Sequence, residues 1–526
     1  MPRTRLLVTA CTLATLVCAF GSLPAGAAQQ PADPAASVAA VPAGSTPGLI
    51  EAALALGTID RSTADRYLAY ALFRPSRLPV RFRSDVPWRG TVPLLGLQQR
   101  VEGAGTTVAR LAGTALRTGG DDCGGYGGTL PRKRVTPHFL IRYDPNAFGG
   151  RLKIRSYSRT LERSWGTEIG RFDWPAPPFG AGSRSLYHVR IEDLGSGLYG
   201  FVTTNGATAG FVGNNPNTPW ADHDAYSSCM VLNNDYRGFP SSPLRSLRAT
   251  AAHEFNHSIQ FGEGALTGVD APDLVFTEGA ATWMEDEVFD RANDNYFYLW
   301  PALTPSMGAY PENYGVYSYW VVFRAMVEQY GTGVAGGSED VLQTFWKATS
   351  RETAGNLAAM DLALQTKGTT LADAFHYAAI SIRLSVSCGG GYVYPYCLQE
   401  GARYVATAGR VGNNGAISTI GFGISRSVRD NYAASFIGLP KTGTTYDITL
   451  SNDDTGGQLR GSVVCDLGAT LMVTPLSQVV GGGTQTTLAN FDSAGCTTLV
   501  LVITNQQQNS ANPTKSPDRV FTVSTI

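Results

Sequence analysis

The middle of the chain changes from strand-like to helical patterning, and this change predicts its fold class. Short apolar runs separated by turn residues come first, and a helical stretch over residues 152–169 lies among them. From residue 244 to about 327 the apolar positions recur with mostly helical spacing. Strands followed by helices predict an α+β domain, which we place at residues 121–405. The expected strands are 138–143, 187–191 and 228–232.

The last part of the chain, residues 406–526, has a different pattern. It is rich in Gly, Thr, Ser, Val and Asn, and apolar and polar residues alternate in short runs such as 446–450 and 498–503. Clusters of turn residues such as 451–454 separate these runs. Short alternating runs between turns predict an all-β sandwich domain.

Residues 29–120 form a third region, which opens with an Ala/Pro/Ser-rich stretch typical of disorder. Two helical patterns follow, one over 47–56 and one over 60–73 with Ser62 as its candidate N-cap. A Gly/Thr-rich segment, 103–120, has the composition of a linker. The region is therefore either an inhibitory propeptide, as often precedes an exported hydrolase, or an ordinary helical subdomain.

The N-terminus has the three parts of a secretory signal peptide. Two arginines within the first five residues precede an apolar run over 6–23, and small residues follow a proline. We therefore expect residues 1–28 to be a signal peptide, cleaved after Ala27 or Ala28, and the protein to be secreted. The alternative is an uncleaved membrane anchor, which the Gly and Pro at the end of the run disfavour. No later stretch is long and apolar enough to span a bilayer.

The charge balance excludes some classes of partner. Lys and Arg total 41 and Asp and Glu total 42, which gives a net charge of −1. A chain without excess positive charge offers no general attraction to nucleic acid or to anionic membranes. We expect neither nucleic acid nor a membrane as a partner of the mature protein.

Cysteine usage agrees with export. Six cysteines lie beyond the predicted signal peptide, and an even count in an exported chain favours disulfides over metal knuckles. Proximity in the sequence suggests two pairs, which leaves the third. The expected disulfides are Cys388–Cys397, Cys465–Cys496 and Cys123–Cys229.

The residues that carry chemistry lie in a segment of good helix formers, where His253, Glu254 and His257 form a His-Glu-x-x-His pattern. On a helix, positions 253 and 257 are about 40° apart and one turn along the same face. Two neutral imidazoles there can bind one Zn²⁺. Glu254 can take a proton from the water that the metal acidifies and deliver it to a leaving nitrogen. The alternative is two histidines on a partly buried helix face.

A catalytic zinc site needs a third protein ligand, and three downstream acids are candidates. Glu263 points away from both imidazoles on a continuous helix, so we reject it. Glu285 is possible, but its neighbours offer no supporting pattern. Glu278 is the best candidate because it follows His257 by 21 positions, which leaves room for a loop and a second helix that folds back. The small residues 279–281 are expected to let that helix pack closely on the first. The alternative for Glu278 is a helix cap.

These segments resemble the gluzincins, the thermolysin and M1-aminopeptidase type of zinc peptidase. The resemblance implies a zincin-like catalytic domain with a mixed sheet and motif helices, zinc held by His253, His257 and Glu278, and Glu254 as the base. More narrowly, the chain is similar to a group of secreted bacterial metalloproteases with a His-Glu-x-x-His-x-x-Gln helix. The matching segments are His253-Glu254-x-x-His257 and Glu278-Gly279-x-Ala281-x-Trp283-x-Glu285.

Two departures from the gluzincin pattern bear on the chemistry. Thermolysin-like enzymes carry an Asp four positions after the third ligand, where it orients a zinc histidine. Here that position is Thr282, and we expect Asp286, one turn further, to take its place. The Gly-x-Met-Glu-Asn segment with which M1 aminopeptidases hold a free amine is absent. Its absence favours an endopeptidase.

Gluzincins stabilise the developing oxyanion with a His or Tyr from beyond the third-ligand helix. Four tyrosines cluster between residues 310 and 319, and we take Tyr314 and Tyr317 as the candidates, with at least two of the four expected to be core residues. His376 is expected to be a core or surface histidine. We interpret the histidines before the motif as structural; these are His138, His188 and His223.

Two further sites follow from analogy or composition. By analogy with gluzincins, a peptide substrate is expected to add as a strand to an edge strand before the motif helix, for which 229–234 is the candidate. Asp290, Asn293 and Asp294, and separately residues 452–454, are weak Ca²⁺ candidates. Neither set has a full ligand-loop spacing, so turn formation is their default role.

The sequence therefore predicts a secreted zinc endopeptidase that acts on proteins or peptides. One alternative is a catalytically inactive exported binding protein on a zincin scaffold, although a metal site alone has no need of Glu254. Another is a zinc hydrolase of a non-peptide substrate such as a glycan or an ester.

Overall fold

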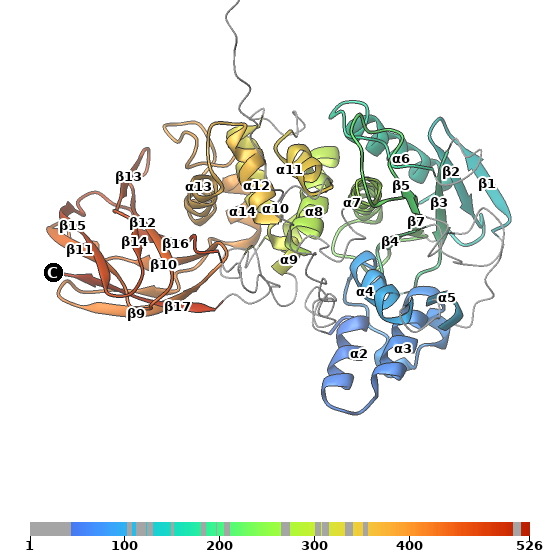
Figure 1. The fold of residues 1–526 in the computed structure, drawn as a ribbon, viewed down its shortest axis with the longest axis horizontal. Helices are drawn as coiled ribbons and strands as arrows, with labels where there is room; N and C mark the ends of the chain where they lie inside the picture. Colours follow the sequence, from blue (N-terminus) through green and yellow to red (C-terminus); the bar gives the residue numbers. More distant parts are fainter. Residues whose placement is uncertain are drawn as a thin grey trace, which may run out of the picture.

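A computed structural model gives the architecture of most of the chain after residue 43 (Figure 1). The expected signal peptide, residues 1–28, lies outside the described residues. The structure describes residues 44–102, 108–111, 123, 130–148, 152–179, 186–195, 197–204, 211–264, 274–299, 307, 315–331, 340–350, 356–508 and 517–526.

The N-terminal region is helical, as expected. The second helix begins after Asp60, whose carboxylate accepts a hydrogen bond from the Thr63 N–H at 2.7 Å. The N-cap is therefore Asp60 and not Ser62, because Asp60 has the extended backbone that a cap requires. The helices are α2 (Thr46–Ala55), α3 (Arg61–Phe73), α4 (Thr91–Glu102) and α5 (Val108–Leu111), with short 3₁₀ turns η1 (Pro75–Arg77) and η2 (Val80–Phe82).

A five-stranded sheet follows, with the strand order β1-β2-β3-β7-β4. Its three inner strands run parallel, whereas β1 and β4 are antiparallel edge strands. The prediction of residues 229–234 as an edge strand is wrong, because β7 lies between β3 and β4. The strands are β1 (Arg132–Val135), β2 (Phe139–Tyr143), β3 (Tyr187–Glu192), β4 (Gly200–Thr204) and β7 (Ser228–Asn233), and a separate ribbon pairs β5 (Phe211–Gly213) with β6 (Ala225–Tyr226).

The sheet is covered on both faces, which is why β7 carries no polar alternation. Successive strand residues point to opposite faces. Met230 and Leu232 pack in the main core with α6 (Ile154–Glu168) and α7 (Pro243–Gly262). Phe201 and Val231 pack in a second core with the N-terminal helices. The N-terminal helices and the sheet are thus parts of one packed unit (Figure 1).

The helices that follow confirm the α+β expectation for this part of the chain. Gly279 was expected to let α8 pack closely on α7, but the structure gives it a different role. A Cβ at this position meets Phe323 at 2.8 Å and the Val316 carbonyl oxygen at 3.2 Å, so it permits close approach of α9 and α10. The helices are α8 (Leu274–Phe289), α9 (Gly315–Ser318), α10 (Trp320–Tyr330), α11 (Asp340–Ser350), α12 (Asn356–Gln365), α13 (Leu371–Leu384) and α14 (Gly401–Ala408), with the 3₁₀ turn η3 (Asn295–Tyr298).

The C-terminal part consists of strands, as expected, in two sheets that enclose a third apolar core. His376 of α13 is fully buried against one sheet, where its ring nitrogens contact Ser462 and Thr504, both at 2.8 Å. The strands are β8 (Gly415–Ala416), β9 (Gly423–Arg429), β10 (Ala433–Gly438), β11 (Thr445–Asn452), β12 (Gln458–Asp466), β13 (Leu471–Pro475), β14 (Val479–Val480), β15 (Thr484–Asp492), β16 (Thr498–Asn505) and β17 (Asp518–Thr525).

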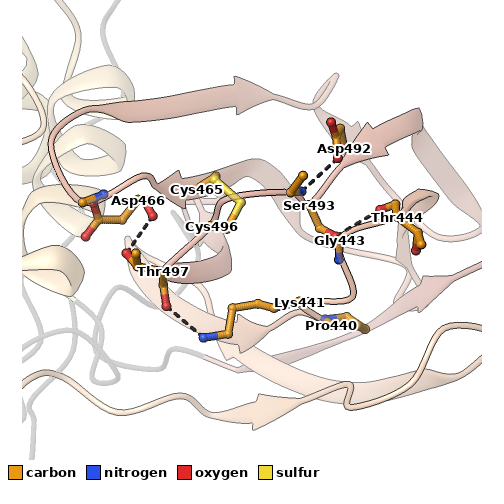
Figure 2. Close-up of a disulfide and its surroundings, with 12 residues drawn as sticks. Pro440, Lys441, Gly443, Thr444, Cys465, Asp466, Asp492, Ser493, Cys496 and Thr497 are labelled. Carbon is orange, nitrogen blue, oxygen red and sulfur yellow. Dashed lines mark hydrogen bonds between the residues drawn. A yellow bond between two sulfur atoms is a disulfide. The ribbon is translucent and has the colours of Figure 1, made fainter.

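All three expected disulfides are present: Cys123–Cys229, Cys388–Cys397 and Cys465–Cys496. Figure 2 shows Cys465 at the end of β12 bonded to Cys496 in the turn before β16. Disulfides are typical of proteins that leave the reducing cytoplasm. In the part of the chain that the structure describes, no helix combines the length and apolar composition needed to cross a membrane.

Candidate metal centre

Helix α7 presents the His-Glu-x-x-His motif in a fully buried setting. It has Pro243 at its N-terminal end after the cap residue Ser242, a position where the missing proline N–H costs no hydrogen bond. The rings of His253 and His257 lie one turn apart on the same face, with centroids separated by 4.6 Å. The helix therefore aims two imidazoles at one point, as the spacing predicts.

Helix α8 brings a carboxylate to that point. Glu278 Oε2 lies 2.9 Å from His253 Nε2 and 3.4 Å from His257 Nε2, and the two Nε2 atoms are 3.0 Å apart. Ligands bound tetrahedrally to zinc at 2.0–2.1 Å are separated by roughly 3.3 Å. The three side chains thus form a group that could hold a metal ion.

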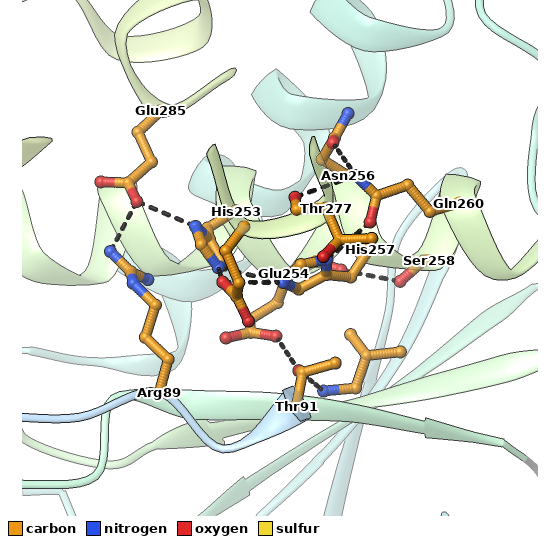
Figure 3. A network of polar contacts seen from close by, with 12 residues as sticks. Arg89, Thr91, His253, Glu254, Asn256, His257, Ser258, Gln260, Thr277 and Glu285 are labelled. Carbon is orange, nitrogen blue, oxygen red and sulfur yellow. Dashed lines mark hydrogen bonds and ion pairs between the residues drawn. The ribbon is translucent and has the colours of Figure 1, made fainter. Parts of the chain in front are cut away.

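Each imidazole is held from its other ring nitrogen. His257 Nδ1 contacts Gln260 Oε1 at 2.8 Å, and His253 Nδ1 contacts Glu285 Oε1 at 3.0 Å (Figure 3). Such partners fix the orientation of a metal-binding imidazole. The expectation that Asp286 takes this role is wrong: Asp286 instead pairs with Arg324, because it lies on another side of α8.

Burial and neighbouring charges shift the pKa values of all three side chains. Burial, followed by the nearby Arg89, holds the pKa of His253 well below its ordinary value. Burial alone would raise the pKa of Glu278, but the two imidazoles hold it well below its usual range. For His257, burial lowers the pKa and Glu278 more than offsets that effect. A neutral His253 and an ionised Glu278 are the states that a metal ligand requires.

Glu254 lies beside this group and is also fully buried. Its Oε2 accepts a hydrogen bond from the Thr91 hydroxyl at 2.7 Å, and burial raises the pKa of the carboxyl group. Glu254 Oε1 and Glu278 Oε1 have no hydrogen-bond partner among the described residues. Two buried carboxylate oxygens of this kind fit a site that takes a cation and a reacting water.

Of the two candidate tyrosines, only Tyr317 is among the described residues. Tyr317 is buried with its ring centroid 6.3 Å from that of His253, and burial followed by Glu278 raises its pKa well above the ordinary value. Tyr314 lies outside the described residues. His138 contacts Glu162 at 2.7 Å and stacks on Trp165, consistent with the structural role assigned to it.

The Ca²⁺ candidates also divide. Asp290 lies with Asp286 and Glu400 in a group of carboxylates whose oxygens are within 4.8 Å of one another, but Asp294 is not in it. Residues 452–454 make turn and strand contacts: Asn452 donates to the Gly456 and Gly457 carbonyl oxygens, and the two aspartates contact Thr522 and Arg519.

Three residues of the site had been given no role from the sequence: Arg89, Thr91 and Gln260. Gln260 follows His257 by one turn, so its position on the helix was a usable signal. Arg89 pairs with Glu285 across 196 positions, and Thr91 with Glu254 across 163. No local pattern reports contacts of that range.

The motif helix ends at a buried, unpaired acid, and this predicts a pH effect on stability. Burial, reinforced by Asp222, raises the pKa of Glu263 to about 8, and neither carboxylate oxygen has a hydrogen-bond partner among the described residues. The folded state therefore binds a proton that the unfolded state releases above about pH 4.5, so the free energy of unfolding falls as pH rises towards 8. We expect Glu263→Gln to remove this fall. Between pH 5 and pH 8 the free energy of unfolding of the variant should therefore rise by roughly 2–4 kcal/mol relative to that of the parent.

Urea unfolding of parent and variant at pH 5, 7 and 8 measures this effect. Asp518→Asn is the control, because its side chain is 60% exposed. If the Glu263→Gln variant loses stability with pH as steeply as the parent, then Glu263 does not take up a proton on folding.

Comparisons with known proteins add little to this geometry. No family model matches the chain, and no curated protein matches it. Among the solved structures, a chain of the infectious bursal disease virus Gx strain is similar over 20% of this chain, with 10% sequence identity and a TM-score of 0.12. This chain covers 25% of that viral chain.

Proposed function

We propose that the protein is a secreted zinc endopeptidase built on a zincin-like domain. The observation that carries the proposal is the convergence of His253, His257 and Glu278 from two helices, with Glu254 beside them. The resemblance to gluzincins supports the same ligand set. A mixed sheet covered by the motif helix is consistent with the proposed domain, and the three disulfides are consistent with secretion.

The roles of the residues follow from their chemistry. His253, His257 and Glu278 would hold zinc through two imidazole nitrogens and one carboxylate oxygen. The bound ion would supply Lewis acidity to the attacking water and the peptide carbonyl group. Glu254 accepts a proton from the water and delivers it to the leaving nitrogen, which is general base and then general acid catalysis. Gln260 and Glu285 keep the two imidazoles in place.

Tyr317 is our candidate for stabilising the developing oxyanion. It is the predicted tyrosine that the structure places beside His253. A phenol whose pKa is raised by burial stays protonated and can donate a hydrogen bond to an anion. Tyr314 keeps its place as a second candidate on the resemblance alone.

Metal removal tests the proposal. Protein recovered from the medium of an exporting bacterial host should contain about one zinc ion per chain and hydrolyse casein. Dialysis against 1,10-phenanthroline should remove the zinc and the hydrolysis together, and added Zn²⁺ should restore both. Casein hydrolysis that persists in zinc-free protein would show that the hydrolysis does not depend on a metal at this site.

A further inference from the structure

The outer edge of β4 is already paired with the protein's own chain. β4 is the last strand in the order of the sheet, and such an edge can pair with a further segment of chain. The Trp88 N–H donates to the Gly197 carbonyl oxygen at 2.8 Å, the Tyr199 N–H donates to the Trp88 carbonyl oxygen at 3.1 Å, and the Gly90 N–H donates to the Gly200 carbonyl oxygen at 3.0 Å. Residues 88–90 therefore run beside residues 197–200, which lead into β4, with one parallel β-bridge between Trp88 and Leu198.

The next residue connects this edge to the proposed base. The Thr91 hydroxyl oxygen accepts a hydrogen bond from the Val202 N–H at 2.9 Å and donates to Glu254 Oε2 at 2.7 Å (Figure 3). The hydroxyl thus lies between the strand edge and the carboxylate that would receive a proton from water. A peptide bound along β4 would need the same N–H and the same space.

Arg89 links the segment to the metal group through Glu285. Its guanidinium group is fully buried, lies 2.5 Å from Glu285 Oε1 and is 4.8 Å from the centre of the Tyr199 ring. Glu285 in turn holds His253. The segment therefore contacts two carboxylates at the site: Arg89 contacts Glu285, and Thr91 contacts Glu254.

The side chains of the site are fully buried. His253, His257, Glu254 and Glu278 are each 0% exposed. A protein substrate must reach the metal and the base, so the site has to open before each turnover. The segment is carried by α4 and by the packed N-terminal helices, which share their core with one face of the sheet.

We infer that residues 88–91 are an internal inhibitor of the site. They occupy the start of the β4 edge, at Gly200 and Val202, where an extended peptide substrate would bind by strand addition. The site becomes active when the N-terminal helices release this segment. The inference rests on the proposed function, since it describes regulation of the same site.

Gly90 offers a test that changes neither a metal ligand nor the base. A Cβ at Gly90 meets Phe201 Cβ at 2.9 Å, the Gly200 carbonyl oxygen at 3.1 Å and Leu198 Cδ1 at 3.1 Å. Gly90→Val should therefore push the segment off β4. Gly166→Ala is the control, because a Cβ there has nothing within 4 Å.

Three measurements on the full chain loaded with zinc follow the segment. Gly90→Val should increase the rate of amide hydrogen exchange at Val202, the rate of zinc extraction by 1,10-phenanthroline and the rate of casein hydrolysis, each by about tenfold or more. Gly166→Ala should match the parent in all three. Faster exchange and extraction without any hydrolysis would support the inhibitory contact and overturn the proposed peptidase function.

A cleavable chain guards against a Gly90→Val variant that fails to fold. A recognition sequence for a specific protease is placed between residues 112 and 113, and the folded, zinc-loaded protein is cut. Separation of the N-terminal fragment should raise casein hydrolysis by about tenfold or more, and adding the fragment back should lower it again. The inference is overturned if the uncut parent hydrolyses casein as fast as the separated protein, or if the fragment has no effect when added back.

Discussion

Glu254→Gln is expected to keep about one zinc ion per chain but to hydrolyse casein roughly 10²–10⁴-fold more slowly than the parent. The amide has the shape of the carboxylate and can still accept the hydrogen bond from Thr91, so the fold and the metal group are preserved. It cannot accept a proton from water. The loss should therefore appear in kcat, with zinc content unchanged.

Glu263→Gln is the matched control for this variant. It makes the same chemical change at the end of the same helix, in a residue that is equally buried but is not in the metal group. It should hydrolyse casein like the parent. Both variants are assayed after release of the N-terminal fragment, so that inhibition does not hide the difference. Parent-like hydrolysis by Glu254→Gln would remove Glu254 from the proposed mechanism.

The sequence carries enough information to predict the part of the site that lies on consecutive helices. His253 and His257 need only the helical repeat to share a face, and Glu278 needs only one helix to fold back on the previous one. The structure brings these three together within contact distance. The disulfides were predictable for a related reason, because two of the pairs are close in sequence and the third follows by elimination.

The position of a strand within the sheet could not be predicted in this way. Strand β7 is buried on both faces, and its composition does not distinguish a central strand from an edge strand. Its neighbours are set by which strands pair at long range, and local periodicity does not report that pairing. The role of Gly279 was misassigned for the same reason, since a small residue permits close packing without specifying the partner.

The contacts of Arg89 and Thr91 are the most distant and the least predictable. Arg89 lies just before α4 and Thr91 is the first residue of that helix, with no pattern that marks either as part of a site. Their significance depends on the edge of β4, which only the three-dimensional arrangement reveals. Composition and order in the chain suggest an inhibitory N-terminal region as one of two alternatives. Which of its residues would inhibit depends on contacts that the sequence does not report.

Two glutamates of α8 give the sharpest test of the ligand assignment, because both contact the same imidazole from opposite sides. Glu278 lies 2.9 Å from Nε2 of His253, the nitrogen that faces His257, and Glu285 lies 3.0 Å from Nδ1. If zinc is bound on the Nε2 side, Glu278 is a ligand and Glu285 orients the ring. Glu→Gln at each position is the same chemical change with different consequences.

We expect Glu278→Gln to retain no zinc through dialysis, since a zinc site of this type uses a carboxylate and not an amide. Glu285→Gln should still bind zinc, with an affinity about 10–100-fold lower, because an orienting partner is weakened. Competition with a chromogenic chelator measures both affinities. Zinc that is lost from Glu285→Gln but kept by Glu278→Gln would show that the two assignments are reversed.

Stability of the metal-free proteins should rank the same two variants in the opposite order. Glu285 is the ionic partner of the buried Arg89, and breaking such a pair leaves an uncompensated charge that costs about 3–5 kcal/mol. Glu278 raises the pKa of His257, so its replacement also removes a favourable interaction. An imidazole left without that carboxylate can lose its proton and become neutral, which a guanidinium group cannot, so the cost is smaller than for Glu285. Urea unfolding without zinc should therefore find Glu285→Gln the less stable variant, although it is the better zinc binder. A simple loss of packing in either variant would not produce this crossing of metal affinity and stability.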